Sequence, residues 1–232
     1  MTPVLDQSQI DRFHRDGFTV VDRLVPDDAL PVLRAAYDEL IDGGGAPGDR
    51  LLGGLTRQVM RPADTHPVFA DNPAFRLGVQ IARQLVGGPV RREFDMLIFK
   101  QPGHPHETPW HQDASYSELP FAPAGAAVPL GALQFWVALD DVDTENGCMH
   151  FVPGRQHTLL QHHVASGDPD DPGRLLALDD PAAQLDLSTA VAAPLRAGGC
   201  TIHSYGTPHY TPPNRSATRP RRAYIFNLAP AD

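Results

Sequence analysis

Two residues near the middle of the chain, His111 and Asp113, have the types and the spacing of metal ligands. Side chains alternate between the two faces of a β-strand, so residues two apart share a face. If the segment TPWHQDASY (108–116) is a strand, an imidazole nitrogen and a carboxylate oxygen converge on one point. A second histidine from a distant strand would complete a facial triad, which leaves three positions open on an iron(II) ion. A chelating 2-oxo acid takes two of these positions and dioxygen takes the third.

An isolated His-x-Asp triplet also occurs on protein surfaces, so the rest of the sequence has to support the metal site. The candidates for the third ligand are His203 and His209, which both lie on expected strands. Arg221 follows one strand later, and its planar guanidinium suits the distal carboxylate of 2-oxoglutarate. Its neighbours Arg219 and Arg222 are expected to be solvated at a turn rather than to face a barrel interior.

These residues lie in a region, 89–232, that is expected to consist of short strands separated by Gly, Pro, Asp and Asn. Such a pattern is typical of an antiparallel barrel or jelly roll. The expected strands are 89–100, 108–116, 132–139, 148–152, 191–197, 200–205, 208–212 and 222–229.

The first third of the chain has helical spacing instead. Helices are expected at 7–15, 27–41 and 73–86, with one short strand at 18–25. Asp27 or Asp28 is the expected N-cap of the second helix. Glycines are expected to end the first and third helices.

Two long segments, 117–131 and 164–190, resist assignment. Both are rich in Pro, Ala, Gly and Asp. Long irregular segments in a compact domain are usually lids or binding loops, so we expect them to border the open side of the barrel.

Composition limits the class of protein. With 232 residues, 41% of them apolar, the chain is expected to form a single domain, with residues 1–88 a mainly helical flank and residues 89–232 the jelly-roll core. The net charge of −9 disfavours nucleic acid or an anionic membrane as a partner. The lack of a signal peptide or long apolar run predicts a cytoplasmic protein. Cys148 and Cys200 are expected to be buried and unpaired.

Three blocks of the sequence resemble the phytanoyl-CoA dioxygenase superfamily of iron(II)/2-oxoglutarate oxygenases. They occur in the family's order, and together with the helical N-terminus the resemblance spans most of the chain. The blocks are DMLIFKQPG…TPWHQDASY (95–116), LQFWVALDDVDTENGCMHFVPGRQH (133–157) and HYTPPNRSATRPRRA (209–223).

The resemblance implies roles for individual residues. It assigns His111, Asp113 and His209 to iron, with His203 as the competing third ligand. It assigns Arg221 to the 5-carboxylate of 2-oxoglutarate.

Three further positions follow from it with less specific roles, and a fourth, Gln134, follows from strand alternation. Thr211 stands where a serine of the family often binds the same carboxylate as Arg221. Met96 and Trp136 match positions that pack against the co-substrate, although plain core packing explains them nearly as well. Gln134 shares a strand face with Trp136 and is expected to give it a polar neighbour.

The expected function is that of a non-haem dioxygenase with iron(II), 2-oxoglutarate and O2. It would hydroxylate an unactivated C–H bond of a secondary metabolite or amino-acid-like compound and release succinate and CO2. Desaturation, epoxidation or cyclisation are alternative outcomes of the same chemistry. A non-catalytic jelly-roll binding protein is the alternative from another class. The partner is expected to be a small molecule, and the protein a monomer or homodimer.

Overall fold

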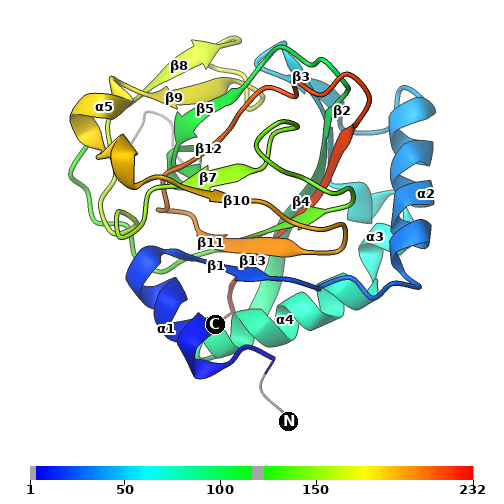
Figure 1. The fold of residues 1–232 in the computed structure, drawn as a ribbon, viewed down its shortest axis with the longest axis horizontal. Helices are drawn as coiled ribbons and strands as arrows, with labels where there is room; N and C mark the ends of the chain where they lie inside the picture. The colour runs from blue at the N-terminus through cyan, green and yellow to red at the C-terminus, as the bar shows by residue number, and fades with distance from the viewer. Residues whose placement is uncertain (1–3, 117–122, 232) are drawn as a thin grey trace.

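The largest feature of the computed structural model, which describes residues 4–116 and 123–231, is a seven-stranded antiparallel sheet (Figure 1). Its strands run in the order β1-β11-β6-β13-β4-β3-β2. They are β1 (Phe18–Val21), β2 (Asp49–Leu52), β3 (Thr56–Met60), β4 (Val90–Lys100), β6 (Leu133–Ala138), β11 (Cys200–Ser204) and β13 (Arg221–Pro230).

A four-stranded sheet faces the large sheet, and the two together make the jelly roll that the sequence predicts. Its order is β10-β7-β12-β5. The strands are β5 (Thr108–His111), β7 (Met149–Phe151), β10 (Val191–Ala193) and β12 (His209–Thr211). Side chains of β7 and β10 pack against the inner face of the large sheet, so the site residues lie between the two sheets.

The predicted helices pack on the outer face of the large sheet (Figure 1). They are α1 (Gln7–Asp16), α2 (Leu30–Asp42) and α4 (Pro73–Val86), and a short helix that was not predicted, α3 (Pro67–Ala70), precedes α4. Gly17 and Gly87 end α1 and α4 in the left-handed conformation, as predicted. The expected cap of α2 was wrong, because α2 begins after Ala29 and no side chain caps it.

Strand β6 shows how one sequence serves both faces. Leu133, Phe135 and Val137 join the cluster under the helices, whereas Trp136 and Ala138 pack toward the second sheet. This alternation follows from the two-residue period of a strand. In β6, the interior side chains of Gln134 and Trp136 therefore each lie between two apolar neighbours that pack under the helices.

The first 88 residues contain the predicted helices and also three strands of the large sheet. The hairpin of β2 and β3 was not predicted, because polar residues such as Arg50, Arg57 and Gln58 dilute the alternation of a strand. Its turn contains Gly53 and Gly54, both with positive φ. The hairpin extends the large sheet beyond β4 and becomes one wall of the cavity described below.

Segment 164–190 has more regular structure than its composition indicates. It contains the end of β8 (His162–Ser166), all of β9 (Leu175–Leu178) and the short helix α5 (Pro181–Gln184). Pro172 of this segment lines the cavity, and the lid role stays a prediction. Of the other long segment, residues 117–122 lie outside the described part of the chain.

Within residues 4–116 and 123–231, the helices are all too short or too polar to cross a membrane. Cys148 and Cys200 are buried and unpaired, as expected.

Candidate active site

The two predicted histidine ligands stand side by side on neighbouring strands. His111 is the last residue of β5 and His209 is the first of β12, and the antiparallel register pairs them directly. Their ring centroids are 4.1 Å apart, and both side chains are buried. Strand pairing thus brings together two residues that lie far apart in the sequence.

Asp113 reaches the same point by a different route from the one predicted. Strand β5 ends at His111, and Asp113 begins a 3-10 helix (Asp113–Tyr116), so the strand argument was wrong for this residue. The carboxylate nevertheless converges: its Oδ1 lies 3.7 Å from the Nε2 atoms of both His111 and His209. One ligand atom from each of the three residues falls within 4.8 Å of the others.

The turn between His111 and Asp113 is held by the residue between them. Gln112 is fully buried; its amide donates to the carbonyls of Thr158 and Gly206, and its Oε1 accepts from Leu160 N–H. These bonds fix the point at which the strand changes into the 3-10 helix.

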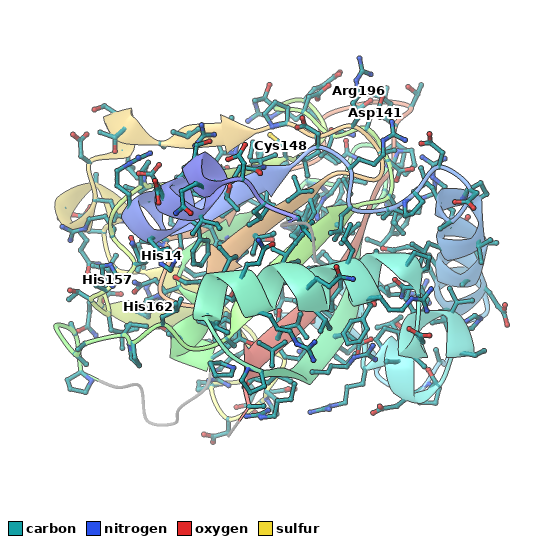
Figure 2. All side chains as sticks on the ribbon, turned by 90° about the horizontal axis from the view of Figure 1, so that it is seen from below. His14, Asp141, Cys148, His157, His162 and Arg196 are labelled. Atoms are coloured by element: carbon teal, nitrogen blue, oxygen red, sulfur yellow. The ribbon has the colours of Figure 1, made fainter. Side chains whose placement is uncertain are left out.

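A buried histidine without a predicted role supports the same turn. The Nε2 of His162 accepts from the backbone N–H of Gln112 at 3.1 Å, and Ser115 Oγ contacts its ring (Figure 2). Its own Nδ1 bonds to the carbonyl of Leu160.

The tautomers of His111 and His209 suit metal binding. The Nδ1 of His111 lies 2.7 Å from the carbonyl of Pro109, and the Nδ1 of His209 lies 2.9 Å from the carbonyl of Thr207. A carbonyl only accepts hydrogen bonds, so each Nδ1 carries the proton and each Nε2 offers its lone pair. Burial and the neighbouring His111 hold the pKa of His209 well below its usual value, which keeps this ring neutral.

The carboxylate of Asp113 divides its two oxygens between two tasks. Oδ1 faces His111 and His209, whereas Oδ2 accepts from Gln134 Nε2 at 2.6 Å and lies 3.3 Å from His203 Nε2. Burial alone would raise the pKa of Asp113, but the surrounding histidines outweigh it and hold that pKa below its usual range. The alternative ligand, His203, therefore faces Oδ2 of Asp113 rather than the Oδ1 that converges with His111 and His209.

A cavity of about 470 Å³ opens onto the three ligands. All of the predicted co-substrate residues line it: Met96, Gln134, Trp136, Thr211 and Arg221. Its size is in the range of small-molecule sites.

Arg221 is the largest unsatisfied polar group in this cavity wall. Its side chain is buried, and among the described residues its Nε and Nη1 have no hydrogen-bond partner. The guanidinium lies 5.3 Å from the centre of the Trp136 ring. Burial lowers the pKa of Arg221 to about 10, so the group remains a cation at neutral pH.

Lys100 is a second buried basic residue, and it was not predicted from the sequence. Its Nζ donates to Thr211 Oγ1 at 3.1 Å and to the Pro212 carbonyl at 2.9 Å. Burial and the nearby Arg221 hold the pKa of Lys100 well below its usual value. Strand alternation places Lys100 on the same face as Met96, and this signal could have identified it.

Outside the cavity lining, a further histidine is buried. His104 is 7% exposed, and its Nε2 lies 3.1 Å from Thr56 Oγ1.

Comparison with known proteins agrees with the geometry. The sequence profile of the phytanoyl-CoA dioxygenase (PhyH) family matches residues 13–223. A phytanoyl-CoA dioxygenase domain-containing protein 1 from Rattus norvegicus is 32% identical over 184 residues, which cover 72% of this chain and 56% of the relative. The homologue from Bos taurus is 28% identical over 279 residues, and the match covers 91% of that relative. The chain thus spans little more than half the length of the rat relative, but nearly the whole of the bovine one.

A solved structure is similar over almost the full chain. The crystal structure of EvdO2 from Micromonospora carbonacea var. aurantiaca, complexed with 2-oxoglutarate, superposes with a TM-score of 0.82 at 31% sequence identity. The match covers 98% of this chain and 92% of that protein.

Proposed function

Because the chain belongs to the phytanoyl-CoA dioxygenase family, we propose that it is an iron(II)- and 2-oxoglutarate-dependent dioxygenase that hydroxylates a C–H bond of a small molecule. One observation carries the proposal. A group of two histidines and one carboxylate shares a cavity with a buried arginine that the described residues leave unpaired.

The donor set fits iron(II). Two imidazole Nε2 atoms and one carboxylate oxygen are the ligands of the facial triad, which leaves the rest of the coordination sphere open. His111, Asp113 and His209 would hold the metal through these atoms. The backbone carbonyls behind both histidines and the Gln134 amide behind Asp113 fix the three side chains before any metal binds.

The inner end of the cavity fits a dicarboxylate. Neither Arg221 nor Lys100 forms an ion pair with an acidic side chain of the described residues, although both are buried. A buried guanidinium without a counter-charge is costly, and an anionic ligand removes that cost and also favours the charged form of the neighbouring Lys100. The distal carboxylate of 2-oxoglutarate would accept from Arg221, while Thr211 and Lys100 complete the pocket.

When bound, iron and 2-oxoglutarate supply the oxidising power. The overall reaction takes one C–H compound, one O2 and one 2-oxoglutarate to one alcohol, one succinate and one CO2. Three apolar side chains line the cavity near Arg221 and exclude water there: Trp136, Met149 and Ile225. The chain's own contribution is therefore to position the reactants and to keep the inner cavity dry.

The test is a screen for succinate release with iron(II), ascorbate and 2-oxoglutarate across candidate small molecules. We expect release that depends on iron and that one compound class stimulates. A protein that binds iron and 2-oxoglutarate but never releases succinate would instead be a non-catalytic binding protein.

A further inference from the structure

The outer part of the cavity, beyond the metal ligands, has polar groups that the proposed reaction does not use. Two arginines line one part of it: Arg50 lies in β2, and Arg61 directly follows β3. Asn227, Tyr205 and Glu93 line another. The two parts differ in charge and in what they offer a ligand.

The part lined by the arginines is a local positive site in a chain of net charge −9. Arg50 is half-buried, and its Nε donates to Gln58 Oε1 at 3.1 Å. Within the described part of the chain, Arg50 and Arg61 form no ion pair with a carboxylate, whereas Arg57 of the same hairpin pairs with Asp49 at 2.9 Å. Arg57, which does not line the cavity, is thus neutralised by an ion pair, whereas Arg50 and Arg61 line the cavity without one, with Asp171 as the acidic side chain that acts on Arg50 from a distance.

The backbone of Arg61 supports the same interpretation. Arg61 has φ 53° and ψ 48°, a left-handed conformation that is unfavourable for a residue with a side chain. A hydrogen bond from its N–H to the Asp95 carbonyl at 2.8 Å holds it there. Strained residues of this kind concentrate at ligand sites, because the surrounding structure must enforce them.

Asn227, on β13 next to β4 in the same sheet, presents a hydrogen-bond acceptor whose identity the hydrogen-bond network fixes. The Tyr205 hydroxyl donates to Glu93 Oε2 at 3.1 Å, so it must accept from Asn227 at 2.8 Å. The Asn227 atom nearest Tyr205 is therefore the amide nitrogen, and the amide oxygen is left over. This Oδ1 is buried and has no partner among the described residues.

Asn227 also lies next to the metal ligands. In the register of β13 and β6 it faces Gln134, the residue whose amide donates to Asp113. A donor group bound to Asn227 would therefore lie beside the point where the C–H bond has to be placed. A buried acceptor without a donor is unfavourable, so the ligand that fits here carries an N–H or O–H group.

We propose that the substrate is a small organic acid with an amine or hydroxyl group, whose acidic group binds Arg50 and Arg61 and whose donor binds Asn227. This inference rests on the proposed function. A carboxylate, a sulfate and a phosphate would all satisfy the arginines, so the experiment separates them.

The experiment uses protein loaded with iron(II) and saturated with 2-oxoglutarate under nitrogen, so that no turnover occurs. Binding of 2-oxoglutarate is measured first, by calorimetry. Three probes of one ring size are then titrated: L-proline, L-prolinamide, which lacks the acid, and cyclopentanecarboxylate, which lacks the amine. Inorganic phosphate and sulfate are titrated in parallel.

We expect L-proline to bind at least about tenfold more tightly than either analogue. Arg50→Gln and Arg61→Gln should weaken L-proline but not L-prolinamide. Asn227→Leu should abolish the preference for L-proline over cyclopentanecarboxylate. If phosphate or sulfate binds more tightly than L-proline and Arg50→Gln removes this binding, the acidic group of the substrate is a phosphate or sulfate rather than a carboxylate.

Arg196→Gln is the matched control, because Arg196 pairs with Asp141 at the molecular surface, outside the cavity (Figure 2). An unchanged 2-oxoglutarate affinity in every variant shows that fold and inner site are intact. The inference is overturned if the amide binds as well as the acid, or if none of the anions binds saturably at millimolar concentration. Failure of 2-oxoglutarate itself to bind would instead count against the proposed function.

Discussion

Arg221 and Arg222 are adjacent in β13 but belong to opposite faces of the large sheet. Arg222 points toward the helices, where it forms ion pairs with Asp38 at 2.8 Å and Asp140 at 2.6 Å. Arg221 points into the cavity, where its Nε and Nη1 find no partner among the described residues. The same residue type thus stabilises the fold through ion pairs on one face and is available to bind a ligand on the other.

The difference extends along the whole sheet. On the helix face, β6 and β13 contribute apolar residues such as Phe135 and Phe226, whose rings stack at 4.9 Å. On the cavity face, polar residues such as Gln134 and Asn227 alternate with apolar ones such as Trp136 and Ile225. The helix face therefore supplies most of the fold's stability, and the cavity face can hold groups chosen for binding.

The largest expected effect comes from removing a metal ligand from the cavity face. His209→Ala should abolish iron binding and turnover, because the triad loses both affinity and geometry. Equilibrium binding of iron(II), with circular dichroism to confirm folding, measures this. His203→Ala is the control and should still bind iron; the reverse pattern would mean that His203 is the third ligand.

The second prediction separates the two adjacent arginines. Arg221→Ala leaves the 5-carboxylate of 2-oxoglutarate without its partner, at a cost of about 3–5 kcal/mol. The half-saturating 2-oxoglutarate concentration should therefore rise roughly a hundredfold or more. Arg221→Lys should recover only part of the loss, because an ammonium lacks the two-pronged geometry.

Arg222→Ala provides the matched comparison in the same titration. It should leave the 2-oxoglutarate requirement nearly unchanged and instead lower the free energy of unfolding, since Asp38 and Asp140 lose their partner. A larger 2-oxoglutarate defect in Arg222→Ala than in Arg221→Ala would reverse the assignment of the two faces.

A smaller effect is expected where the cavity face supports a ligand indirectly. Gln134→Leu removes the donor to Asp113 Oδ2 and should lower iron affinity about ten- to hundredfold. Gln58→Leu is the control, because Gln58 lines the same cavity but contacts Arg50 and Met96 rather than a ligand. Equal iron affinities in the two variants would show that the Gln134 bond does not position Asp113.

The smallest expected effect is on stability and concerns two buried histidines that have hydrogen-bond partners within the chain. Burial lowers the pKa of His104 and of His162 from 6.5 to about 4. Between these values the unfolded chain binds protons that the folded chain does not, so stability falls as the pH falls from 6.5 toward 4.

At pH 5 each histidine should reduce the free energy of unfolding by about 1–2 kcal/mol relative to pH 7. Urea unfolding at the two pH values measures the difference, and His104→Gln should reduce it. If the difference is unchanged in this variant, His104 does not contribute to the pH dependence of the free energy of unfolding.

Local signals predicted those parts of the molecule whose structure depends on neighbours in sequence. Helix α4 has the predicted bounds because its apolar period and its terminal glycine are both local. Strand β13 also follows from local alternation, but the expectation that Arg222 is solvated at a turn was wrong, because Arg222 lies in the strand and pairs with Asp38 and Asp140.

Features that depend on distant contacts were missed. Asp113 leaves the strand because Gln112 bonds to residues 158, 160 and 206, which no local pattern reveals. Alternation indicates the face on which Lys100 lies, but its burial depends on the turn after β12, which covers this end of the strand. The β2–β3 hairpin owes its place to pairing with β4 rather than to its own propensity.

The central claim is that metal and 2-oxoglutarate bind together on the cavity face. A crystal structure of the protein soaked anaerobically with manganese(II) and 2-oxoglutarate, with anomalous data to locate the ion, tests it directly. The account predicts one ion bonded to Nε2 of His111, Nε2 of His209 and one oxygen of Asp113, with a ligand carboxylate on Arg221. An ion bound through His203, or a 2-oxoglutarate that leaves Arg221 without a partner, would contradict it.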